Sequence, residues 1–161
     1  MNNIKYGWKD KYDNIHYNVD ETFSNNYVLD TPDEVLNNKV GVCWDQVELE
    51  RNLFEKINIK FDTFFIVHYY DNKCLTHTFL IYKENNSYYW FEHSWEKFRG
   101  IHIYKTELEA LKDIKNKFIN YELNGNYNDN NLCLYKYKKP KYGINCLQFY
   151  KHCEQGENIN I

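Results

Sequence analysis

Three stretches rich in aromatic and β-branched residues follow one another closely, and short polar segments separate them. They are FDTFFIVHYY at 61–70, LTHTFLIYK at 75–83 and SYYWFEHSW at 87–95. Aromatic and β-branched residues favour strands, and the intervening DNK and ENN segments are typical of turns. Because such short connections join antiparallel neighbours, this stretch predicts an antiparallel meander. Two more strand-like segments lie at 101–104 and 132–138.

The segment 44–57 has the pattern of a helix that is buried over much of its surface. At about 100° per residue, its apolar side chains fall on one broad arc, which holds Trp44, Val47, Leu49, Leu53, Phe54 and Ile57. Gln46 and Glu50 fall inside the same arc, and buried polar side chains need hydrogen-bond partners. Since helices come first and strands follow, we expect the α+β class, with this helix packed against the antiparallel sheet.

Two further helices carry start signals. Thr31 can cap a short helix, Pro32 suits its first position, and Glu34 completes a capping box. Thr106 and Glu109 repeat the capping pattern before another helical segment. The final twenty residues give no clear pattern.

Composition narrows the class of protein. The 161 residues suit a single domain, residues 1–161, and the chain carries 20 Lys and Arg against 23 Asp and Glu. That balance predicts no binding to nucleic acid or to an anionic membrane. No apolar run reaches the roughly 20 residues that span a bilayer, and the N-terminus lacks the apolar core of a secretory signal. We therefore expect a cytoplasmic protein in which the five cysteines stay as free thiols.

Cys43 follows a glycine-containing turn in the segment KVGVCWDQ and opens the buried helix. At a helix N-terminus, the macrodipole and the unpaired N–H groups favour the thiolate over the thiol. The same N–H groups can stabilise an oxyanion after a thiolate attacks a carbonyl. Taken alone, however, a free cysteine is more often a small buried hydrophobe, and a nucleophile needs a base with an orienting acceptor.

His77 and Glu92 are the candidates for the base and its acceptor, since they lie on neighbouring predicted strands. A two-residue turn at 85–86 would leave Glu92 diagonally beside His77 on the same face of the sheet. A turn at 84–85 would put the two directly opposite each other. A three-residue turn would instead put His77 opposite His93 and turn Glu92 away. With Glu92 nearby, one ring nitrogen donates to the carboxylate and the other faces the thiol.

These segments together resemble the core of the transglutaminase-like superfamily. In that family a Gly-x-Cys sequence opens a central helix, and a His and an Asp follow on neighbouring strands in a papain-like arrangement. The resemblance covers roughly residues 31–96. It implies that Cys43 is the nucleophile, His77 the general base and acid, and Glu92 the third member. Two positions depart from the family pattern, since Glu92 replaces the usual Asp and Phe79 replaces the usual Trp.

The resemblance implies a cysteine-dependent hydrolase or acyl transferase. Such an enzyme acts on an amide bond of a peptide, a protein or a small carboxamide through an acyl-thioester, and it requires no metal or organic cofactor. Two alternatives remain, a non-catalytic binding module on the same fold and a thioester-dependent N-acyltransferase. His93 and Glu96 are the neighbours that could take the third position in place of Glu92.

A metal site in the C-terminal part is a weaker hypothesis. Its candidate ligands are Cys133, Cys146, His152 and Cys153. A structural zinc site usually contains two ligands separated by two to four residues, and adjacent His and Cys residues suit one tetrahedral centre poorly. We therefore expect no metal. The substrate, the choice between hydrolysis and transfer, and the oligomeric state are not fixed by the sequence.

Overall fold

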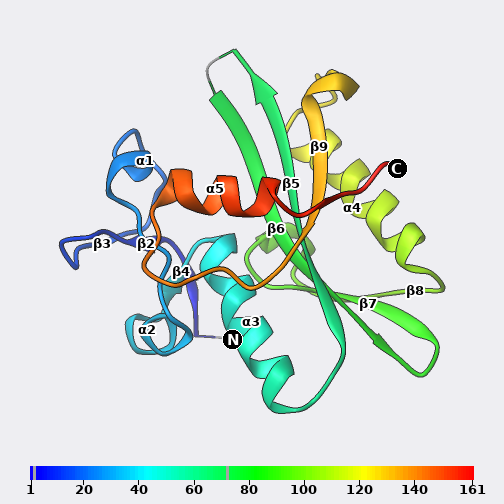
Figure 1. Ribbon diagram of the computed structural model, residues 1–161, viewed down its shortest axis with the longest axis horizontal. Coiled ribbons are helices and arrows are strands. Elements are labelled where there is room, and N and C mark those ends of the chain that lie inside the picture. The colour runs from blue at the N-terminus through cyan, green and yellow to red at the C-terminus, as the bar shows by residue number, and fades with distance from the viewer. Residues whose placement is uncertain (2, 72) are drawn as a thin grey trace.

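The computed structural model describes residues 1, 3–71 and 73–161, and helices cover both faces of its main sheet (Figure 1). In chain order the first elements are β1 (Lys5–Tyr6), β2 (Trp8–Lys9), β3 (Ile15–His16), α1 (Phe23–Asn26), α2 (Pro32–Asn38), β4 (Val40–Gly41) and α3 (Cys43–Lys56). They are followed by β5 (Phe61–Tyr70), β6 (Lys73–Glu84), β7 (Ser87–Glu92), the short 3₁₀ helix η1 (Glu96–Phe98), β8 (Gly100–Tyr104) and α4 (Glu107–Tyr121). The last elements are the 3₁₀ helix η2 (Asp129–Asn131), β9 (Leu132–Tyr137), α5 (Cys146–Glu154) and β10 (Glu157–Asn158).

An antiparallel sheet forms the centre of the fold. Within the described residues it has six strands in the order β10-β9-β5-β6-β7-β8. The strands β5 to β8 pair with their chain neighbours as a meander, and β9 pairs with the other edge of β5. The α+β class and the antiparallel meander predicted from the sequence are therefore confirmed.

The central strand β5 contributes to the core on both faces of the sheet. Phe65 and Val67 belong to the cluster formed with α3 and α5, whereas Phe64 and Ile66 belong to the cluster formed with α4. Successive residues of a strand point to opposite faces, so a run without polar residues is what a doubly covered strand requires. Figure 1 shows α3 and α5 on one side of the sheet and α4 on the other.

The hairpin between β6 and β7 has a two-residue turn at 85–86, the first of the three turns that the sequence left open. Glu84 pairs with Ser87, and Asn85 and Asn86 have φ angles of 47° and 63°. Asparagine tolerates these left-handed angles better than most residues, and this turn type matches the twist of the flanking strands. The register therefore leaves Glu92 on the same face as His77, as expected for this turn.

The third strand ends earlier than the sequence predicted. We expected a strand to residue 95, but β7 ends at Glu92. The Glu92 carboxylate accepts hydrogen bonds from the Trp95 backbone N–H at 2.7 Å and from the Ser94 hydroxyl at 2.9 Å. These bonds curl the chain back on Glu92, so the next residues cannot continue the ladder with β6.

Helix α3 begins at Cys43 and ends at Lys56, and its residues Cys43 to Arg51 are buried. The predicted apolar arc is wrong at its last turn, since Leu53 is 36% exposed and Ile57 is 63% exposed. Phe54 takes the position that faces the sheet, with its ring centroid 4.9 Å from that of Tyr82. The two neighbouring aliphatic side chains therefore turn away from the sheet.

The two predicted N-cap residues, Thr31 and Thr106, are confirmed, but at the second helix the Glu109 carboxylate accepts from the Lys105 N–H and does not complete a capping box. The Thr31 side chain and Glu34 form a capping box at the start of α2, and Pro32 is the first residue of that helix. The Thr106 hydroxyl accepts from the Glu109 N–H at 3.1 Å at the start of α4. Because each helix start is fixed locally, these two boundaries could be read from the sequence.

The chain termini contribute elements that the sequence did not predict. Near the N-terminus β1 pairs in parallel with β4, which sets Tyr6 opposite Gly41. Near the C-terminus α5 packs on α3 through Phe149, whose ring is stacked on Trp44 with centroids 4.5 Å apart. Both elements meet α3 near its first residue, so they help to shape the surroundings of Cys43.

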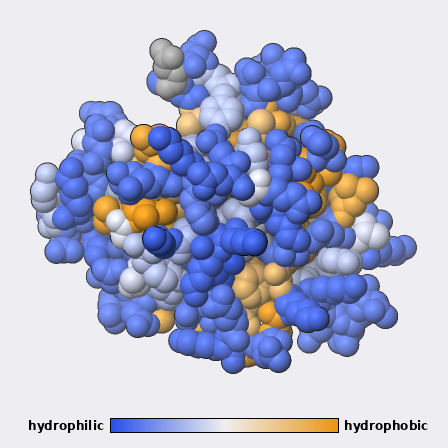
Figure 2. Space-filling view, in the orientation of Figure 1, coloured by the Kyte–Doolittle hydropathy of each residue, from blue (hydrophilic) through white to orange (hydrophobic). Residues whose placement is uncertain are grey.

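The surface in the view of Figure 2 is mainly hydrophilic, and its apolar side chains gather in several separate patches. No helix in the described ranges is both long enough and apolar enough to cross a membrane.

Candidate active site

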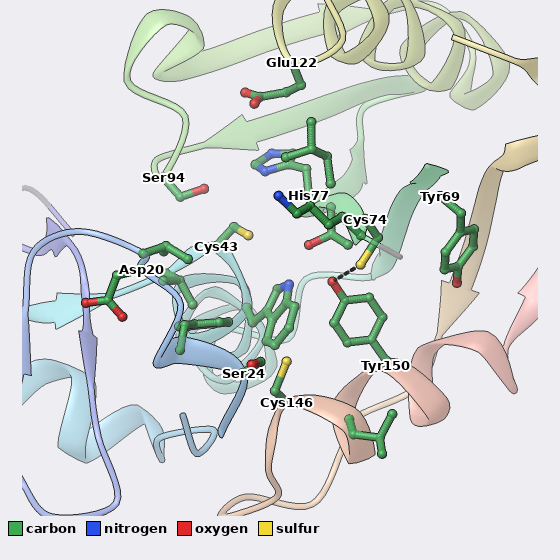
Figure 3. A pocket seen from close by; sticks show the side chains of 18 of the residues that line it. Asp20, Ser24, Cys43, Tyr69, Cys74, His77, Ser94, Glu122, Cys146 and Tyr150 are labelled. Atoms are coloured by element: carbon green, nitrogen blue, oxygen red, sulfur yellow. Dashed lines mark hydrogen bonds between the residues drawn. The ribbon is translucent and has the colours of Figure 1, made fainter. Parts of the chain in front are cut away.

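A cleft with a volume of about 1270 Å³ lies where the start of α3, the strand β6 and the helix α5 come together. Cys43, His77, Ser94 and Tyr150 are among the residues that line it. Figure 3 shows the sulfur of Cys43 pointing into this cleft, with His77 on a neighbouring wall. Two of the three predicted site residues, Cys43 and His77, therefore line the same cleft.

Close packing fixes Cys43 at the start of α3. A Cβ atom at Gly41 would lie 3.0 Å from the Cβ of Asp45 and 3.4 Å from Cγ of Gln46, so only glycine fits easily there. The Asp45 carboxylate accepts from the Val42 N–H at 3.0 Å and from the Tyr27 hydroxyl at 2.7 Å. These contacts hold the first turn in place, and the Cys43 side chain remains 5% exposed at the cleft.

The third predicted residue, Glu92, lies behind His77. Its Oε2 atom is 2.8 Å from Nε2 of His77, and its Oε1 atom accepts the bonds from Ser94 and Trp95. A carboxylate can only accept, so Nε2 of His77 is the protonated nitrogen and Nδ1 is the nitrogen available to the thiol. Both side chains are buried, with His77 7% and Glu92 2% exposed.

The charges of His77 and Glu92 stabilise each other in this buried setting. Burial lowers the pKa of His77, but the Glu92 charge and hydrogen bonding with Cys43 and Glu92 outweigh it and raise that pKa to about 10. Burial likewise opposes ionisation of Glu92, yet the His77 charge and the hydrogen bonds to this carboxylate lower the pKa of Glu92 below its usual value. An imidazolium beside a thiol favours the thiolate.

The neighbours considered as alternatives to Glu92 lie elsewhere. His93 points to α3, where its Nδ1 atom lies 2.6 Å from Oε1 of Gln46. Glu96 belongs to the short helix η1 and is exposed. Of the three acceptors considered for His77, Glu92 is therefore the one that lies beside it.

Gln46 links the start of α3 to the segment that follows Glu92. Its amide nitrogen donates to the Gly41 carbonyl at 2.7 Å, and its carbonyl oxygen therefore accepts from Nδ1 of His93. Burial lowers the pKa of His93, and its Nε2 atom is buried with no hydrogen-bond partner among the described residues. This neutral contact connects the turn before Cys43 to the residue after Glu92.

Gln46→Ala is expected to destabilise the fold by about 2–3 kcal/mol, because it leaves the His93 N–H and the Gly41 carbonyl buried without their partner. Urea unfolding of the variant and the wild type measures the difference. Gln155→Ala is the matched control, since Gln155 is exposed and its loss should change stability by about 0.5 kcal/mol or less. An equally small change in Gln46→Ala would refute this linking role.

Several residues of the cleft were not anticipated from the sequence. Tyr6 reaches it because β1 pairs with β4 next to Cys43. Tyr150 and Cys74 form another part of the wall, with Sγ of Cys74 2.9 Å from the Tyr150 hydroxyl (Figure 3). Tyr6 depends on a pairing between distant segments and Tyr150 on the unpredicted helix α5. Cys74 lies on β6 and pairs with Tyr69 of β5, so its place in the cleft depends on where α5 packs against that hairpin.

The candidate metal ligands do not gather at one point. Cys133 lies on β9, His152 hydrogen-bonds to the Lys138 carbonyl, and Cys153 is buried in the core. Among the described residues no group of three or more His, Cys, Asp or Glu side chains could hold a metal ion.

The fold and the cleft define a mixed helix-and-sheet protein that presents a thiol beside a buried histidine–carboxylate pair. A family model described as a transglutaminase-like domain matches residues 1–120, and the chain belongs to this family. The resemblance inferred from the sequence is thus confirmed, and the match extends beyond the predicted core, residues 31–96, in both directions. No curated protein and no solved structure matches the chain.

Proposed function

We propose that the protein is a cysteine-dependent enzyme that hydrolyses amide bonds or transfers their acyl group. The observation that carries this proposal is the cleft that Cys43 and His77 share, with Glu92 hydrogen-bonded to His77 at 2.8 Å. Membership of the transglutaminase-like family supports it, since proteins of this family are generally enzymes. In this proposal the helix α3 and the sheet play the roles of a papain-like core.

The reaction begins when the Cys43 thiolate attacks the carbonyl carbon of the amide. A C–S bond forms and the carbonyl electrons move to the oxygen, which backbone N–H groups at the start of α3 stabilise. His77 then gives its proton to the amide nitrogen as the C–N bond breaks, and the amine leaves. The product of this half-reaction is an acyl-thioester on Cys43.

Release of the acyl group regenerates the enzyme. Water or an amine attacks the thioester carbonyl while His77 accepts its proton, and the thiolate departs. Glu92 keeps Nε2 of His77 protonated throughout, so that Nδ1 faces the reacting atoms. No step requires a metal or an organic cofactor.

The C-terminal part of the chain belongs to the proposed site although it lies beyond the family match. Cys146 and Tyr150 of α5 line the same cleft as Cys43, and β9 pairs with the central strand β5. This supports the proposal that residues 1–161 act as one domain.

The test is a panel of blocked peptides and small carboxamides, including amides of glutamine. Release of ammonia or of a new amine is followed with and without an added primary amine, which distinguishes hydrolysis from acyl transfer. The proposal expects turnover by the wild type on at least one member of the panel. It is contradicted if no member reacts and no acyl adduct forms on Cys43 in acid-quenched samples.

A further inference from the structure

The charged side chains of the cleft are mainly acidic. The acidic residues of its lining are Asp20, Glu21, Glu96, Glu122 and Glu154, and its lysines are Lys73 and Lys151, while the charge of His77 is offset by its ion pair with Glu92. The whole chain has a formal net charge of −3, so these residues account for the entire imbalance. Outside the cleft, acidic and basic residues are equal in number.

The acidic residues lie on more than one side of the reacting groups. Figure 3 shows Asp20 on the side of Cys43, and Glu122, which follows α4, on the side of His77. In the part of the chain that the structure describes, no Lys or Arg forms an ion pair with Asp20, Glu21, Glu96 or Glu122. Their charges are therefore available to a ligand.

Aromatic side chains lie among these carboxylates. Tyr69, Tyr70, Trp95 and Tyr150 line the same cleft, and the Tyr69 hydroxyl donates a hydrogen bond to Glu154. A cation over an aromatic face is attracted by the negative charge of the ring. Carboxylates and aromatic faces together form a lining that suits lysine and arginine side chains, whose stems are apolar and whose heads are cationic.

The acidic residues surround a built site and not an open surface. The Cys43 side chain is 5% exposed, and its sulfur points into the cleft that they line. Its neighbour His77 is 7% exposed and has Nδ1 directed away from Glu92. A ligand that reaches these two buried groups occupies the cleft that the carboxylates line.

We propose that the substrate is a basic peptide segment that carries lysine or arginine side chains on both sides of the amide attacked by Cys43. This inference rests on the proposed function and specifies its substrate class. The carboxylates attract the basic side chains and the aromatic rings pack against their stems. The scissile carbonyl then comes to lie at the start of α3.

Binding to the full-length Cys43→Ala variant tests the substrate class without chemistry. The probes are three blocked, fluorescently labelled peptides with a central glutamine flanked by two lysines, two glutamates or two serines on each side. We expect the lysine peptide to bind at least about tenfold more tightly than the serine peptide, and the glutamate peptide to bind most weakly. Rising salt should reduce the advantage of the lysine peptide, because screening weakens exposed charge interactions. If Cys43→Ala does not fold, Cys43→Ser takes its place.

Charge variants locate the effect. When Glu96→Gln and Glu122→Gln are added to the Cys43→Ala variant, binding of the lysine peptide should weaken by roughly three- to tenfold. Binding of the serine peptide should stay unchanged. Glu84→Gln is the matched control, since Glu84 is exposed at the hairpin end of β6 and does not line the cleft. Equal binding of all three peptides, or preference for the glutamate peptide, would overturn the proposal.

The experiments distinguish a wrong substrate class from a wrong enzymatic function. If the lysine peptide binds selectively but the wild type never acylates Cys43, the cleft binds basic peptides and the enzymatic proposal fails. If the wild type reacts with all three peptides at equal rates, the enzymatic proposal stands and the substrate class is wrong.

Discussion

The Cys43→Ala variant is expected to lose amide hydrolysis and acyl transfer, with kcat/KM reduced at least about 1,000-fold. The reason is that no acyl-thioester can form without the sulfur, and His77 alone cannot supply a covalent route. The measurement is release of ammonia or amine from the best substrate of the panel. Circular dichroism and urea unfolding of the same sample establish that the variant is folded.

Cys146→Ala is the matched control for this loss. Cys146 lines the same cleft and is 8% exposed, but burial raises the pKa of its thiol to about 11, so it stays protonated at neutral pH. We expect its activity to remain within about threefold of the wild type. Should Cys43→Ala keep more than about a tenth of the wild-type activity, the nucleophile is another group.

Replacing Glu92 with glutamine should have the second largest effect, a fall in kcat of about 1,000-fold. The amide keeps the shape of the side chain but removes the charge that offsets the burial of His77. Without that charge, the pKa of His77 falls, because the burial that lowers it is no longer opposed by Glu92. An amide can also donate to Nε2, which favours the tautomer with the wrong nitrogen protonated toward the thiol.

The same substitution should change how stability depends on pH. The raised pKa of His77 stabilises the folded state fully below about pH 6.5, and this contribution is lost as the pH rises through about 10. The lowered pKa of Glu92 stabilises the folded state above about pH 4.3, and that contribution is lost as the pH falls. The loss of wild-type stability between about pH 6.5 and 10 that comes from His77 should disappear in Glu92→Gln.

Urea unfolding at several pH values, together with kcat, tests this prediction. Glu109→Gln serves as the control, because Glu109 is an exposed residue at the start of α4 and does not line the cleft. Its pH dependence should match that of the wild type. If Glu92→Gln keeps both the wild-type pH dependence and the wild-type kcat, Glu92 does not hold His77 in a charged pair.

Local signals predicted the two strands that carry His77 and Glu92 and limited the turn between them to three alternatives. Asn85 and Asn86 can adopt the left-handed angles that a two-residue turn needs, and that turn fixes the register of β6 and β7. The register in turn decides which side chains share a face. The placement of His77 and Glu92 on one face of the sheet is therefore determined within about twenty residues of the chain.

Three other features could not be predicted in the same way. The two-residue strand β1 is too short to show a periodic pattern, so nothing indicated that Tyr6 would lie next to Gly41. The end of β7 depends on hydrogen bonds that Glu92 makes to its own neighbours. Leu53 turned to solvent because Phe54 occupies the sheet-facing position of the last helical turn.

Buried polar residues of α3 were recognised as needing partners, but the partners were not identifiable. Gln46 bonds to the Gly41 carbonyl and to His93, which is 47 residues further along the chain. Glu50 is buried, and one of its oxygens has no hydrogen-bond partner within the described ranges. Burial, followed by the nearby Glu92 charge, raises the pKa of Glu50 well above its usual value.

The rate of iodoacetamide labelling at each cysteine, measured by peptide mapping between pH 5 and pH 9, tests the central claim most directly. An ordinary thiol has a pKa of about 8.5, and its labelling rate falls as the pH drops below that value. If His77 and Glu92 activate Cys43, it should be labelled before Cys74, Cys133, Cys146 and Cys153. Labelling of the partly exposed Cys74 and Cys133 ahead of Cys43 at every pH would contradict the account.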